Sequence, residues 1–165
     1  MLKRLFLFIS IISIIILTAC GQPEKESEQH SDQDEHSTGD IREETASASE
    51  LPSFLDDKPE DMRTIYAAVA RNGELLQYIP CYCGCGSTVG HKNNDHCFIK
   101  ERKEDGKIIW DDHGTKCQIC LNIAAAAIVD YQKGKSIKEI RTEIDEQYKK
   151  GFAEPTPTPM PSEDI

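Results

Sequence analysis

Six of the seven cysteines and three of the five histidines of this 165-residue chain fall between residues 81 and 120. The block opens with the sequence PCYCGCG, in which Cys81, Cys83 and Cys85 occupy every second position. Alternate side chains of an extended backbone point the same way, so we expect the three sulfurs to line one side of a short segment. Thiols gathered in this way indicate either a metal site or a cross-linked core, and the rest of the domain has to fold around them.

The chain ahead of the cysteines predicts two helices. The sequence DKPE at residues 57–60 is a helix-start signal, with a cap candidate, an early proline and a glutamate three residues on. Apolar residues then recur at helical spacing up to the Asn-Gly pair at residues 72–73. A shorter helix is expected over residues 74–79, and Pro80 stops it because the residue before a proline is pushed toward extended geometry.

A β-hairpin is predicted in the middle of the cysteine-rich block. Residues 97–100 and 107–110 are runs of β-prone residues on either side of an Asp-Gly turn signal at residues 105–106. In such a hairpin the end of the second strand, residue 110, lies beside the start of the first strand, residue 97. The hairpin is therefore expected to bring His113 close to Cys97.

Two further helices complete the predicted domain. One covers residues 117–133 and ends at Gly134, with both of its thiols facing inward in the first turn. The other opens with a capping box, SIKE, at residues 136–139. The apolar stripe of the first comprises Cys117, Cys120, Ala124, Ala127, Ile128 and Tyr131, and that of the second Ile137, Ile140, Ile144 and Tyr148. The sequence thus predicts a mainly α fold: a small cysteine-rich helical domain with one short β-hairpin over residues 53–151, flanked by disordered segments.

The first 20 residues have the pattern of an export signal. Two basic residues precede an apolar stretch over residues 5–17, which is shorter than the roughly 20 residues that a membrane-spanning helix needs. The sequence LTAC at residues 17–20 resembles the lipobox of bacterial lipoproteins, which implies a signal peptide over residues 1–19 and lipidation, including palmitate, of Cys20. Two acyl chains give stable anchoring, so we expect a protein held to membrane lipid on the extracytoplasmic face of the cell membrane.

Charge and composition separate the domain from its flanks. Residues 21–50 hold 10 acidic and 2 basic residues, whereas residues 51–150 hold 16 acidic and 15 basic ones. The acidic segment has no aromatic residue, so residues 20–52 are predicted to be a disordered tether. The proline-rich residues 152–165 are predicted to be a disordered tail. The domain has no basic patch, and nucleic acid is not an expected partner.

The chain contains the PCYCGC segment, Gly90-His91, the run DHCF at residues 95–98, and His113 ahead of a CxxC helix. With these features it resembles the PCYCGC-motif family of bacterial lipoproteins. The likeness covers roughly residues 55–150. It implies an exported, lipid-anchored protein and brings no established activity. The chemistry has to be argued from the residues.

The first hypothesis for that chemistry is a soft-metal site. Sulfur and imidazole donors suit Cu(I) or Zn(II) better than Mg²⁺ or Ca²⁺, and the helix start at Cys117 favours thiolate. Asp111 and Asp112 are candidates to orient the ring of His113. A metal donor or acceptor protein would be the partner. The candidate ligands are Cys81, Cys83, Cys85, Cys97, Cys117, Cys120, His91 and His113. His96 ranks below them because it is next to Cys97, and neighbouring side chains in a strand point in opposite directions.

Two other functions stay open at this point. Six domain cysteines in an oxidising compartment also suit three disulfides and a non-enzymatic interaction module. The third hypothesis is thiol redox chemistry, with Cys117 attacking and Cys120 resolving, although the chain lacks the βαβ pattern of a thioredoxin-like fold. Leu121 follows Cys120 where a c-type haem site needs histidine, so haem is not expected. The sequence carries no triad or phosphate loop, and we predict no other catalysis.

Overall fold

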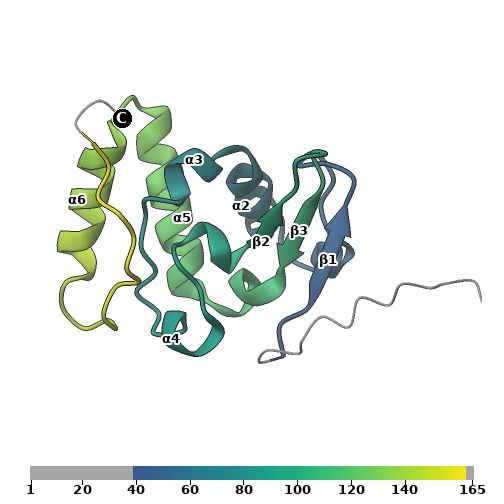
Figure 1. Ribbon diagram of the computed structural model, residues 1–165, viewed down its shortest axis with the longest axis horizontal. Helices are drawn as coiled ribbons and strands as arrows, with labels where there is room; N and C mark the ends of the chain where they lie inside the picture. The colour runs from purple at the N-terminus through teal and green to yellow at the C-terminus, as the bar shows by residue number, and fades with distance from the viewer. Residues whose placement is uncertain (1–38, 163–165) are drawn as a thin grey trace, which may run out of the picture. The chain divides into compact units, whose positions relative to one another are not determined.

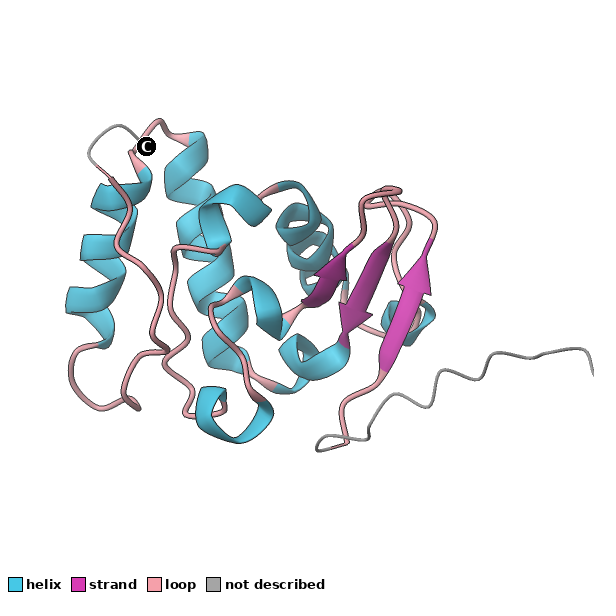
Figure 2. Cartoon of the chain, in the orientation of Figure 1, coloured by secondary structure: helices cyan, strands magenta, loops and turns pink. Residues whose placement is uncertain are grey.

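The computed structural model describes residues 39–162. The predicted signal peptide, Cys20 and most of the predicted tether lie outside these residues. Five α-helices, two of them only four residues long, and a small antiparallel sheet are the main elements of the described part (Figures 1 and 2). The prediction of a mainly α domain with a single hairpin is therefore correct only in part, because the sheet has a third strand.

The sheet has the order β1-β3-β2, with both pairs antiparallel (Figure 2). β2 (Ile99–Arg102) and β3 (Ile108–Asp111) form the predicted hairpin. β1 (Arg42–Thr45) pairs with the other edge of β3 and comes from the segment predicted to be disordered, so that prediction is wrong for these residues.

β1 is held to the sheet by polar contacts that its composition alone does not predict. The indole Nε1 of Trp110 donates to Thr45 Oγ1 at 2.8 Å, and this bond is buried. The guanidinium of Arg42 donates to Asp111 Oδ2 at 3.2 Å. Backbone pairing and satisfied buried groups thus stabilise a strand that has little apolar surface of its own.

The helices are largely those that the sequence predicts. α2 (Glu60–Arg71) and α3 (Gly73–Leu76) lie ahead of the cysteines, and a short α4 (Gly86–Val89) directly follows Cys85. α5 (Gln118–Gln132) contacts α2, α3 and α6 (Ile137–Tyr148), and Figure 1 shows it between α6 and the sheet.

The ends of α5 and α6 follow the predicted signals. Gly134 has φ +91°, a left-handed conformation that favours glycine, just beyond α5. Both bonds of the predicted capping box form at the start of α6, between Ser136 and Glu139. The predicted stripe of α5 is wrong at Tyr131, whose side chain is 43% exposed.

An aromatic cluster under the sheet fixes the loop that carries His113. Tyr66 from α2 packs edge-on against Phe98 at 5.0 Å between ring centroids, and its hydroxyl donates to the carbonyl of Asp111 at 2.9 Å. A Cβ on Gly114 would lie 2.5 Å from the ring of Phe98. Only glycine fits there, and His113 precedes it.

The C-terminal residues are part of the fold. Thr156 is buried and pairs with Cys81 through two bonds: the Cys81 N–H donates to Thr156 Oγ1 at 2.9 Å, and the Thr156 N–H donates to the Cys81 carbonyl at 3.1 Å. Arg141 from α6 also donates to Thr158 Oγ1 at 2.9 Å. The prediction of a disordered tail is thus wrong for residues 152–162, and the folded domain extends beyond residues 53–151 at both ends.

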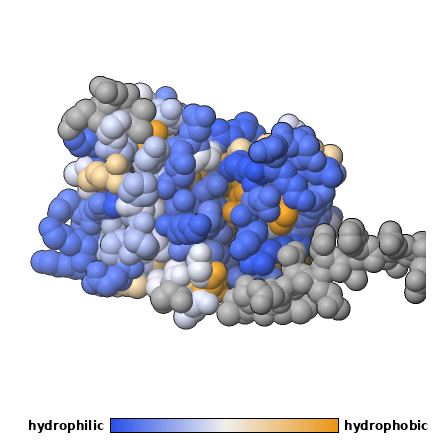
Figure 3. All heavy atoms as spheres, viewed as in Figure 1, coloured by the Kyte–Doolittle hydropathy of each residue, from blue (hydrophilic) through white to orange (hydrophobic). Residues whose placement is uncertain are grey.

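Two further properties concern the surface. Among residues 39–162, no helix is long and apolar enough to cross a membrane. The face drawn in Figure 3 is mostly hydrophilic, with small separate apolar patches.

Replacing Thr156 with valine should lower the free energy of unfolding by about 1–3 kcal/mol, because the buried Cys81 N–H loses its acceptor. Urea unfolding of the full chain followed by circular dichroism measures this. Thr142→Val is the matched control, because its hydroxyl is exposed on α6 and bonds a local carbonyl. Equal midpoints for the two variants would contradict the assigned role of the tail.

Candidate metal centre

The PCYCGC segment is not the extended row that the spacing suggests. Cys81 and Cys83 lie in the loop after α3, and the chain turns at Gly84, which has φ +83°. Cys85 follows in helical geometry, with φ −75° and ψ −18°, directly before α4. The turn brings the N–H of Cys85 to the sulfur of Cys83, 3.4 Å away, and leaves the Cys85 side chain beside Cys83 and His113. Cys81 and Cys83 face the interior with their sulfurs 3.0 Å apart, whereas Cys85 joins neither of the cysteine groups described below.

Two thiols in the first turn of α5 meet them, as the sequence predicts. Cys117 caps this helix, and its sulfur accepts the N–H of Cys120 at 3.4 Å. Cys120 is completely buried, and its sulfur lies 2.9 Å from that of Cys117. The positive end of the helix dipole favours thiolate over thiol at this position.

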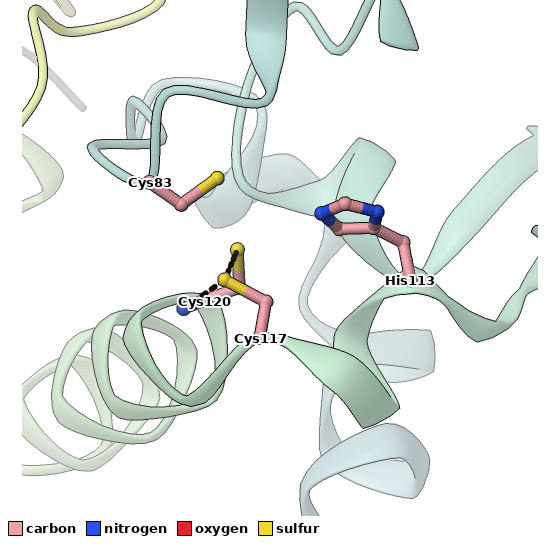
Figure 4. Close-up of side chains that lie close together, drawn as sticks. All are labelled: Cys83, His113, Cys117 and Cys120. Carbon is pink, nitrogen blue, oxygen red and sulfur yellow. Dashed lines mark hydrogen bonds between the residues drawn. The ribbon is translucent and has the colours of Figure 1, made fainter. Parts of the chain in front are cut away.

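A first group of four donors forms where these segments meet. It comprises Cys83, His113, Cys117 and Cys120, and we call it the Cys83 group; its ligand atoms all lie within 4.8 Å of one another (Figure 4). Zn–S bonds are ~2.3 Å and Zn–N bonds ~2.0–2.1 Å, so donors of one ion are at most about 4.6 Å apart. A tetrahedron of such bonds has edges of about 3.8 Å. The 2.9 Å between the sulfurs of Cys117 and Cys120 is shorter than such an edge by about 0.9 Å.

His113 is held in a way that frees one nitrogen for a ligand. Its Nδ1 lies 3.1 Å from a carboxylate oxygen of Asp40, and its Nε2 is buried without a hydrogen-bond partner among the described residues. The ring nitrogen away from the backbone points toward the cysteines in Figure 4. An N–H at Nδ1 donating to Asp40 leaves Nε2 as a bare acceptor, which is the usual arrangement of a metal-bound histidine.

Asp40 is a residue of the site that the sequence analysis did not identify. It lies in the acidic segment predicted to be disordered, and nothing nearby in the sequence marks it. The predicted partners of the His113 ring are engaged elsewhere: Asp111 accepts the backbone N–H of His113 at 3.0 Å, and Asp112 pairs with Lys116 at 2.9 Å. Only the pairing of β1 with β3 reveals that Asp40 reaches the ring.

A second group of three thiols adjoins the first. It comprises Cys81, Cys97 and Cys120, which we call the Cys81 group, and all three are buried. The sulfur of Cys81 lies 3.4 Å from that of Cys120 and 3.7 Å from that of Cys97. Cys120 belongs to both groups, so five sulfurs form one connected set.

His91 lies beside both groups. Its Nδ1 is 3.5 Å from the sulfur of Cys97, and its ring packs edge-on against His113 at 4.6 Å between centroids. Burial, together with the neighbouring His113, lowers the pKa of His91, which favours the neutral ring. Seven of the eight predicted ligands thus converge. Cys85 belongs to neither group, although its side chain interacts with Cys83 and His113. His96 lies in a separate surface pocket with Asp95 and Arg102.

A family model described as "Protein of unknown function with PCYCGC motif" matches residues 9–161. The chain belongs to this family. The resemblance seen in the motif is therefore confirmed over nearly the whole chain. No curated protein and no solved structure matches it. The family description gives a motif and no activity, so the function has to be inferred from the geometry of this PCYCGC-motif protein.

Hydrogen bonds among the sulfurs shift the pKa values of several groups in the centre. Hydrogen bonds from Cys117 and Cys120 lower the pKa of Cys83 to about 4. The sulfurs of Cys117 and Cys83 in turn raise the pKa of His113 to about 12. The pKa of Cys97 falls to about 6 because Cys120 and Cys81 share protons with its sulfur. A metal ion at this centre would replace the shared protons.

Proposed function

We propose that this protein binds a soft transition metal, Cu(I) or Zn(II), at the Cys83 group, and that it handles this metal on the extracytoplasmic face of the membrane. The observation that carries the proposal is the state of His113. Its Nε2 is buried, makes no hydrogen bond with the described residues and faces three sulfurs, while Asp40 holds the opposite nitrogen. A bare ring nitrogen in such a place costs free energy unless an ion or a proton occupies it.

The donor set supports a soft ion that is held and not used in catalysis. Three thiolates and one imidazole match Zn(II) or Cu(I), whereas Mg²⁺ and Ca²⁺ take oxygen donors. Four protein donors fill a tetrahedral ion, and catalytic zinc keeps one position for water or substrate. Metal storage, or transfer to and from a partner protein, is the function that this set supports best.

The proposed location rests on the sequence of the leader. A signal peptide over residues 1–19 and two acyl chains on Cys20 would fix the domain to membrane lipid from outside. Labelling of producing cells with palmitate should mark the wild-type chain and leave a Cys20→Ser variant unmarked. Equal labelling of both chains would exclude this anchor.

The full chain, reduced and purified without oxygen, should bind Zn(II) or Cu(I) in at least stoichiometric amount after reconstitution. His113→Ala should weaken the binding by removing one donor from the group. Metal analysis after competition with a chelator of known affinity measures both. His96→Ala is the matched control and should bind like the wild type, because His96 belongs to neither group and lines a separate pocket. Absence of stoichiometric metal would end the proposal, and rapid oxidation to a Cys117–Cys120 bridge would then favour the thiol redox alternative.

Asp40→Asn should weaken metal binding by about 10–100-fold, because the amide no longer fixes the His113 ring as a carboxylate does. The same competition experiment measures the change. Asp57→Asn is the control, since Asp57 is exposed at the start of α2 and should leave the affinity unchanged. An unchanged affinity in Asp40→Asn, with His113→Ala impaired, would show that another group orients the ring.

A further inference from the structure

The position of Cys120 sets the number of ions that the centre can hold. Its sulfur lies 2.9 Å from Cys117 in the Cys83 group and 3.4 Å from Cys81 in the Cys81 group. A thiolate has several lone pairs and can bind two soft ions at once. The residue is completely buried at the first turn of α5, with its sulfur between the two groups.

The Cys81 group is a complete donor set for an ion of low coordination number. Three thiolates around one ion with bonds of ~2.3 Å stand about 4.0 Å apart in a trigonal plane. The separations of 3.4 Å and 3.7 Å from Cys81 to Cys120 and Cys97 approach this value. Structural zinc sites have four ligands, whereas Cu(I) can be bound by three thiolates alone.

The surroundings of the Cys81 group are also those of a metal site. The imidazole of His91 stands at hydrogen-bond distance from the sulfur of Cys97, 3.5 Å away, and a ring N–H there would donate to a metal-bound thiolate. The backbone on both sides of the Cys81 side chain is fixed by Thr156 of the C-terminal segment. Cys81 and Cys97 are 1% and 0% exposed, so an ion between them would be shielded from water and dioxygen.

We propose that the centre is dinuclear: one ion in the Cys83 group, a second Cu(I) in the Cys81 group, and the sulfur of Cys120 bridging the two. This inference rests on the proposed function, because it adds a second ion to the same centre. Five thiolates, contributed by residues 81, 83, 97, 117 and 120, and the imidazole of His113 would supply all the donors. Two Cu(I) ions would offset part of the negative charge that these thiolates bring into the core.

Anaerobic titration of the full chain with Cu(I), read by native mass spectrometry in the presence of a competing chelator, tests the stoichiometry. The wild type should saturate at two ions per chain, Cys97→Ala should retain one, and His96→Ala, outside both groups, should retain two. X-ray absorption should show copper–copper scattering in the two-ion forms and none in Cys97→Ala. If Cys97→Ala fails to fold, as judged by circular dichroism, Cys81→Ala takes its place, and scattering in the wild type is measured regardless.

The outcomes separate this inference from the proposed function. One ion at saturation in the wild type would overturn the dinuclear centre and leave the single site standing. Two ions without copper–copper scattering, or two ions retained in a folded Cys97→Ala chain, would overturn the bridge. No bound Cu(I) and no bound Zn(II) would overturn both proposals.

Discussion

The structure depends on bringing five sulfurs to one point inside a small core. Thiols buried together share protons, and the sharing lowers the pKa of Cys83 and Cys97 while the proton of Cys120 becomes hard to remove. Thiolate charge in an apolar core is costly unless a cation compensates it. One or two metal ions would compensate this charge. The arrangement is therefore most stable with a positive charge at its centre.

α5 connects the cluster of thiols to the packing of the hydrophobic core. Its first turn supplies Cys117 and Cys120, and its flanks contact α2, α3 and α6. The small side chains of Ala124 and Ala127 are fully buried, which lets neighbouring backbones approach closely. One helix therefore positions two thiols and organises the hydrophobic core, so metal binding at its N-terminus would be coupled to the stability of the whole domain.

Local signals explain what the sequence could predict. The capping box at Ser136, the Asp-Gly turn of the hairpin and the left-handed Gly134 each act within a few residues, and each is confirmed. The prediction of an extended row of three cysteines was wrong, because the chain turns at Gly84 and does not continue as a strand in which side chains alternate. Spacing alone showed which residue types would gather, and the backbone conformation decided which sulfurs would meet.

The remaining errors share one cause. Asp40 and Thr156 lie in segments whose composition indicates disorder, yet each makes a contact more than 70 residues away in sequence: Asp40 with His113, Thr156 with Cys81. Such segments bury little apolar surface, and their order comes from hydrogen bonds to groups that are already fixed. Both contacts fall on candidate ligands. The two polar flanks are thus ordered where they support the candidate metal centre, one by orienting an imidazole and the other by fixing the backbone of a thiol.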